Sequence, residues 1–117
     1  MAIFLSVHGS VELNDEQLPQ LKQIIETNED QNPYLDSWLV HEKGGWSSFA
    51  FFGHTIDQTA LDAVRAQIRR IATTVKSTDG EFTDFVTGHF MVTHENNEGP
   101  HYEWKFSNGK FSEIKLA

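Results

Sequence analysis

The stretch HENNEGPH, residues 94–101, contains two histidines and two glutamates, and imidazole and carboxylate groups are common zinc ligands. In a zinc protease helix the two histidines lie four positions apart, so that both imidazoles point at one ion. Here the residue four positions after His94 is Glu98, and the intervening Asn, Gly and Pro residues favour a turn. The sequence therefore predicts a solvated hairpin loop without a metal. A metal site would require His94 and His101 to meet across neighbouring strands.

Four other histidines are scattered along the chain, and they are His8, His41, His54 and His89. If the strands of His8 and His89 are neighbours, these two imidazoles and a nearby carboxylate have the composition of a general acid–base pair. No spacing indicates a nucleophile with its base, and the chain contains no cysteine. The paired glycines at 44–45 lack the following helix and lysine of a phosphate-binding loop. We therefore predict no catalytic residue and no cofactor.

The negative charge is concentrated in one third of the chain. Residues 1–42 contain eight acidic residues against one base, which gives −7, whereas residues 43–117 contain nine acidic and eight basic residues, which gives −1. A net charge of −8 argues against a nucleic-acid partner, because affinity for phosphate backbones depends on clustered Lys and Arg. Two interpretations of the acidic third remain open. It is a solvated face that favours solubility, or it is a docking surface for a basic protein.

Aromatic residues make up 12% of the chain and gather in two segments, near residues 46–52 and 102–106. Sheet-surface aromatics can stack on bases in RNA-binding domains, but those surfaces also carry basic side chains. The favoured interpretation is core packing, with an exposed patch for protein contact as an addition.

Apolar periodicity predicts two helices and a series of strands. The most strongly periodic segment is residues 57–75, with apolar residues at steps of three and four from Leu61 to Val75. Asn108-Gly109 predicts a two-residue hairpin turn that places Phe106 opposite Phe111. The expected elements are a strand at 3–12, a helix at 15–27, strands at 34–42 and 44–56, a helix at 57–75, a loop at 76–84, a strand at 85–95, and strands at 101–106 and 111–117.

This order, β-α-β-β-α-β-β-β, predicts one α+β domain over residues 1–117, with an antiparallel sheet and two helices on one face. The first six elements have the order of a ferredoxin-like fold, and the last hairpin is an extension. The amino-terminal MAIFLSVHGSVEL has an apolar run of about five residues, shorter than a membrane span or the core of a signal peptide. Together with the absence of cysteine, this predicts a cytoplasmic protein without membrane contact.

A small, cysteine-free α+β chain with its negative charge in VELNDEQ and ETNEDQNPYLD resembles the bacterial immunity proteins that neutralise secreted toxins. The resemblance implies a cytoplasmic inhibitor that binds a basic, nuclease-type toxin and blocks its active site. Complementary charge would raise the association rate and disfavour wrong partners. The predicted partner-binding residues are Asp15, Glu16, Glu26, Glu29, Asp30 and Asp36.

The alternative function is a small ligand-binding protein or enzyme. Such a protein would use an aromatic-lined pocket on the sheet, with two sheets packed on each other in a dimer. The oligomeric state itself does not follow from the sequence. The residues expected to line this pocket are Trp46, Phe52, Tyr102 and Trp104.

Overall fold

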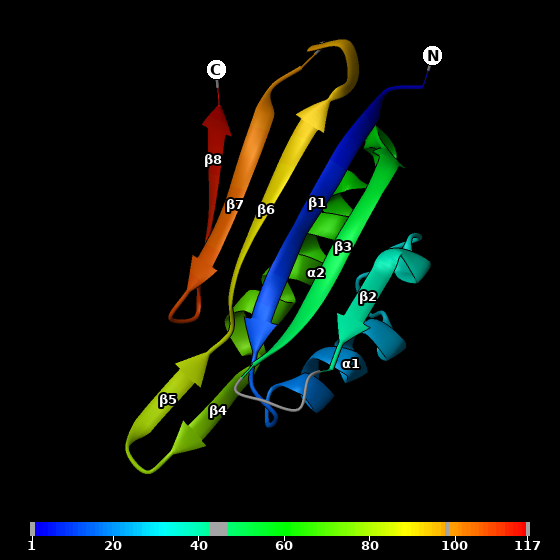
Figure 1. The fold of residues 1–117 in the computed structure, drawn as a ribbon. Coiled ribbons are helices and arrows are strands. Elements are labelled where there is room, and N and C mark those ends of the chain that lie inside the picture. Colours follow the sequence, from blue (N-terminus) through cyan, green and yellow to red (C-terminus); the bar gives the residue numbers. More distant parts are fainter. Residues whose placement is uncertain (1, 43–46, 98, 117) are drawn as a thin grey trace.

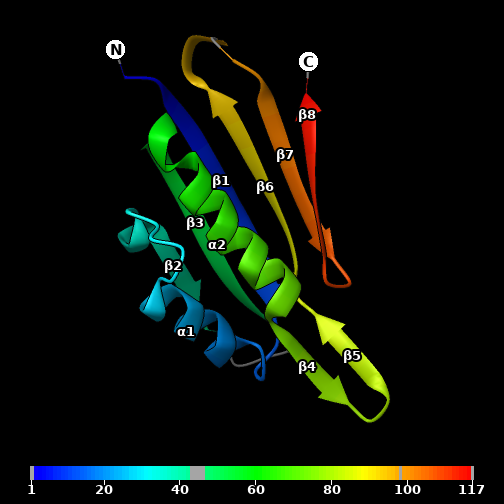
Figure 2. The same cartoon turned by 180° about the vertical axis from the view of Figure 1, so that it is seen from behind.

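A computed structural model describes residues 2–42, 47–97 and 99–116 of the chain. These residues form a six-stranded antiparallel sheet with strand order β2-β3-β1-β6-β7-β8, two α-helices and a separate hairpin, β4-β5 (Figure 1). Both helices lie on the same face of the large sheet, and the other face is uncovered (Figure 2). The predicted α+β class, with two helices and an antiparallel sheet, is confirmed.

The elements have the following bounds. The strands are β1 (Phe4–Leu13), β2 (Trp38–His41), β3 (Ser48–Asp57), β4 (Lys76–Asp79), β5 (Phe82–Phe85), β6 (Thr87–His94), β7 (His101–Ser107) and β8 (Lys110–Leu116). The helices are α1 (Leu18–Thr27) and α2 (Leu61–Thr74), with 3-10 turns at Leu35–Ser37, Gln58–Ala60 and Glu95–Asn97. Neither helix is long and apolar enough to cross a membrane, within the residues described.

Helix α2 follows its predicted apolar stripe and covers the centre of the sheet (Figure 2). Val64, Ile68 and Ile71 are fully buried, as the spacing of three and four residues requires. Asp57 caps the 3-10 turn Gln58–Ala60 that leads into α2. Its carboxylate accepts a hydrogen bond from the backbone N–H of Thr59 at 2.9 Å and another from the Thr59 hydroxyl at 2.8 Å. These two hydrogen bonds lower the pKa of Asp57.

Helix α1 begins at Leu18, three residues later than predicted. A capping box precedes the helix, since Asn14 Oδ1 accepts from the Gln17 backbone N–H at 3.0 Å and Gln17 Oε1 accepts from the Asn14 backbone N–H at 2.9 Å. This box closes a separate turn over residues 15–17 ahead of the α-helix. The later start places Pro19 in the first helical turn, where its missing N–H has no partner to lose.

Residues 76–84 were predicted as a loop, and this prediction is wrong. They form most of the hairpin β4-β5, which projects beyond one end of the large sheet (Figure 1). Asp79 pairs with Phe82 across a two-residue turn, and Gly80 has a φ of +63°. Such a turn needs a residue that enters the left-handed region without strain, which glycine does.

The hairpin β7-β8 has the predicted turn and register. Asn108 and Gly109 have φ values of 54° and 75°, as a type I′ turn requires. Phe106 pairs with Phe111, and Trp104 pairs with Glu113. The prediction from the Asn-Gly dipeptide is therefore confirmed.

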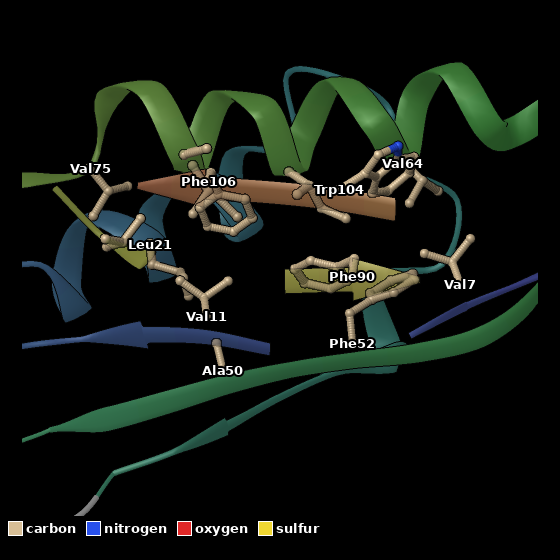
Figure 3. Close-up of a cluster of buried hydrophobic side chains, with 14 of the residues drawn as sticks. Val7, Val11, Leu21, Ala50, Phe52, Val64, Val75, Phe90, Trp104 and Phe106 are labelled. Carbon is tan, nitrogen blue, oxygen red and sulfur yellow. The ribbon is translucent and has the colours of Figure 1, made fainter. Parts of the chain in front are cut away.

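A row of aromatic rings fills the space between α2 and the sheet (Figure 3). Phe52, Phe90, Trp104 and Phe106 come from β3, β6 and β7, and each is at most 4% exposed. Neighbouring rings are in contact, with centroids 6.4 Å apart for Phe90 and Trp104 and 6.2 Å apart for Phe90 and Phe106. This packing fixes α2 on the sheet and leaves the opposite face of the sheet to solvent.

Candidate functional site

An open groove of about 790 Å³ lies between the β4-β5 hairpin and the turn that precedes α1. Four carboxylates line it, two from each side. Asp15 and Glu16 come from the turn, whereas Asp79 and Asp84 come from the hairpin. The other lining residues are polar apart from Phe82, whose side chain is 80% exposed beside the carboxylates. We call these five residues the acidic groove.

Amide side chains fix the two walls of the acidic groove relative to each other. Asn14 Nδ2 donates to Ser77 Oγ at 2.9 Å, and Gln17 Nε2 donates to the backbone oxygen of Asp84 at 2.8 Å. Gln17 is only 2% exposed, so its hydrogen bonds are shielded from water. Gln20 adds two hydrogen bonds to the backbone of Lys76, at 2.6 and 3.0 Å. The turn and the hairpin therefore form one rigid edge.

The acidic groove has an unbalanced negative charge. None of its four carboxylates forms an ion pair with another residue that the structure describes, and no Lys or Arg is among the residues that line it. A concave surface lined by charges of one sign concentrates its field and attracts groups of the opposite sign. The groove is thus suited to cationic side chains of a partner.

The second predicted acidic segment, at the end of α1 and beyond it, is neutralised only in part. Both oxygens of Asp30 accept hydrogen bonds from Arg70, at 2.9 and 3.1 Å, and the Asp30 side chain is 11% exposed. Glu29 lies 3.3 Å from the same guanidinium. The hydrogen bond to Asp30, then its charge, raises the pKa of Arg70. Glu26 and Asp36 are exposed.

Helix α1 separates this second segment from the acidic groove by about 15 Å along its axis, at 1.5 Å per residue. The structure therefore divides the six predicted partner-binding residues. Asp15 and Glu16 join the groove, and Glu29 and Asp30 pair with Arg70. Glu26 and Asp36 are exposed and have no ionic partner among the described residues.

The three described residues that were expected to line an aromatic pocket, Phe52, Tyr102 and Trp104, do not form one. Phe52 and Trp104 are 1% and 0% exposed and point toward α2, so they belong to the core (Figure 3). Tyr102 is partly buried against that core. Trp46 lies outside the described residues.

His94 and His101 do meet, because they lie at the adjoining ends of β6 and β7. The His94 backbone N–H donates to His101 Nδ1 at 3.3 Å, and His94 Nδ1 is hydrogen-bonded to the Pro100 carbonyl oxygen at 2.6 Å. The His94 ring is thus held inside its own loop, packed under Gly99. Among the described residues, no three or more His, Asp or Glu side chains are arranged to hold a metal ion.

We predict that protein purified without chelator contains no stoichiometric metal, because among the described residues His94 and His101 have no third His, Asp or Glu side chain placed to complete a metal site with them. Elemental analysis and thermal unfolding with and without EDTA measure this. Stoichiometric zinc, or a melting temperature lowered by EDTA, would contradict the prediction.

His8 and His89 lie on neighbouring strands, as their acid–base interpretation required, and both face away from the helices. His89 Nε2 is 2.9 Å from Glu103 Oε2, and this hydrogen bond lowers the pKa of Glu103, with Lys105 contributing. The His89 side chain is 48% exposed, so the pair stays hydrated on the sheet surface. We assign it no catalytic role.

Asp79, Phe82 and Asp84 are not among the site residues predicted from the sequence, because residues 76–84 were predicted to form a loop. The Asp79-Gly80 dipeptide was the available signal, because Asp-Gly between short strands marks a hairpin. A hairpin in this position projects its side chains past the end of the sheet, where they can meet the turn before α1.

Comparison of the chain with known protein families, with curated proteins and with solved structures finds no significant match.

Proposed function

We propose that the protein is an inhibitor that binds a basic protein through the acidic groove, as an immunity protein does when it blocks a basic, nuclease-type bacterial toxin. One observation carries this proposal. Four carboxylates without ionic partners among the described residues are held by hydrogen bonds on two facing walls, beside an exposed phenylalanine.

The chemistry of such a partner explains the arrangement. A nuclease binds phosphates with Lys and Arg, so a rigid row of carboxylates can occupy the same cationic surface and exclude the nucleic acid. Charge sets the association rate and the choice of partner, whereas a buried aromatic anchor supplies much of the affinity. Phe82 has the position of such an anchor, because it is exposed at the groove and would lose its contact with water on binding.

We further infer a ferredoxin-like core, with β7 and β8 as its extension. The order β6-β1-β3-β2, with α1 and α2 as the crossovers, supports this inference. Fold alone implies no activity, so the inference serves only to define which strands are the extension. A cytoplasmic location is part of the same proposal, and the absence of cysteine supports it.

The test compares two double charge reversals with the same change of net charge. Asp15→Lys with Glu16→Lys alters the groove, whereas Glu26→Lys with Asp36→Lys alters exposed acids outside it. The candidate partner is the product of the neighbouring gene, co-purified with this protein, and association rates are measured against salt. We expect the groove variant to associate about tenfold more slowly at low salt and the matched control less than about twofold more slowly.

Both variants should fold like the wild type, because exposed charges contribute little to stability. Equal slowing by the two variants would show that only net charge matters and would remove the groove from the mechanism. Association that is independent of salt and unchanged in both variants would contradict the proposal, as would the failure of the neighbouring gene product to bind.

A further inference from the structure

The uncovered face of the large sheet is a second surface with its own chemistry (Figure 1). Because paired residues of adjacent strands share a face, one row crosses all six strands from edge to edge. This row consists of Leu39, Phe51, Ser10, His89, Lys105 and Ser112.

Exposed apolar side chains gather on this face. Six large apolar residues of the described chain are exposed, and four of them project from the uncovered face. Leu39 and Phe51 lie together at one edge and are 64% and 41% exposed, while Ile114 lies at the other edge and is 43% exposed. Phe4, the fourth, is at the end of β1. Exposed apolar side chains on one face of a sheet are a feature of contact surfaces, and here Leu39 and Phe51 are direct neighbours.

The charge of this face differs from that of the rest of the chain. The half formed by β2, β3 and β1 has two carboxylates, Glu12 and Asp57, and no lysine or arginine among its described residues. The half formed by β6, β7 and β8 has Lys105 and Lys110 against Glu103 on this face. The face thus has three acidic and two basic groups, or −1, and its two halves have opposite sign. A chain of net charge −8 can approach its own copy here without strong repulsion.

The size of the face suits a stable interface. Six strands about 4.8 Å apart, with an average length of about 25 Å, present roughly 700 Å² in projection. A standard interface buries about 800 Å² on each partner. The acidic groove lies at the end of the molecule, so this surface is separate from the one proposed for the basic partner.

We propose that a second copy of this chain covers the open face, with the two sheets packed face to face about a two-fold axis that runs along the strands between β1 and β6. This axis places the half with the carboxylates over the half with the lysines, twice in each dimer. It also places Leu39 on β2 of one copy over Ser112 on β8 of the other, because both belong to the row that crosses the sheet.

The first measurement is the mass of the protein in solution by sedimentation equilibrium. We expect a dimer at about 100 μM, since an interface of this size commonly has a micromolar or lower Kd. The double variant Leu39→Glu with Phe51→Glu should be monomeric. Gln23→Glu with Gln58→Glu is the matched control, because these residues are exposed outside the face and the charge change is the same. The control should remain dimeric, and circular dichroism checks that both variants fold.

The second measurement identifies the orientation, and the absence of cysteine makes it direct. Each variant carries one cysteine, so a short bis-maleimide can join only two separate molecules, and the product shows which strands of the two copies face each other. We expect a mixture of the Leu39→Cys and Ser112→Cys variants to give a cross-linked heterodimer in preference to either homodimer.

Three results would overturn the proposal. A wild-type monomer at about 100 μM would exclude a dimer of useful affinity. Cross-linking of Ser112→Cys only to itself would indicate pairing of β8 edges or a different axis. Equal dissociation by the face variant and its control would show that added charge, and not the face, sets the association.

Discussion

Replacement of Trp104 by alanine is expected to lower the free energy of unfolding by about 3 to 5 kcal/mol. Trp104 is fully buried, and its ring lies 6.0 Å from Phe111 and 5.7 Å below the guanidinium of Arg65. Its Nε1 donates to Glu113 Oε1 at 2.9 Å, the oxygen that also accepts from Arg65 Nε at 2.8 Å. The indole therefore joins α2 to β8 by both packing and hydrogen bonding. Urea denaturation followed by circular dichroism measures the loss.

Trp104→Phe is the control that separates these contributions. Phenylalanine keeps most of the ring but cannot donate to Glu113, so we expect a loss of about 1 to 2 kcal/mol. If Trp104→Ala costs less than about 1 kcal/mol and instead abolishes partner binding, Trp104 is an interaction residue and the description of the core is wrong.

The sequence predicted those elements whose signals are local. Helix α2 has an apolar stripe repeated over four turns, and the burial of Val64, Ile68 and Ile71 follows from that spacing alone. The turn at Asn108-Gly109 defines the register of β7 and β8 because few residue pairs accept its backbone angles. In both cases the residues that carry the signal also form the element.

The acidic groove was only half predictable, since its walls are far apart in the sequence. Asp15 and Glu16 were identified from the concentration of charge, but Asp84 reaches them through a hydrogen bond between residues 67 positions apart. Asp30 pairs with Arg70, which is 40 positions away in the sequence. Its charge is therefore balanced, which the sequence alone does not show. Charge counted along the chain does not distinguish a free carboxylate from one that a distant arginine binds.

The distribution of charge in three dimensions explains why one chain can have two contact surfaces. The four carboxylates of the acidic groove cluster at the end of the molecule that holds the hairpin, whereas the open face of the sheet is close to neutral. A basic partner is attracted to the first surface, and an identical acidic chain is tolerated only at the second. Each surface can therefore be altered without changing the other.

Gly9→Ala is expected to destabilise the protein by about 2 to 3 kcal/mol, because the site has no room for a methyl group. Gly9 lies on β1 opposite Phe90 of β6, and the Phe90 ring lies over it. An added Cβ would be 2.6 Å from Phe90 Cα and 2.6 Å from its ring atom Cδ2, and it would collide with the backbone oxygen of His89. Two of these three atoms belong to the backbone of β6, so the steric clash can be removed only if β6 moves away from β1.

Gly53→Ala is the matched control on the adjacent strand. Gly53 pairs with His8 on the uncovered face, and an added Cβ would meet only His8 Cβ, at 3.8 Å, which is an ordinary contact. We expect this variant to be stabilised by about 0.5 to 1 kcal/mol, because alanine loses less backbone entropy than glycine on folding. The two substitutions add the same methyl group to neighbouring strands and should change the free energy of unfolding in opposite directions. Equal effects of the two would show that Phe90 does not pack over Gly9.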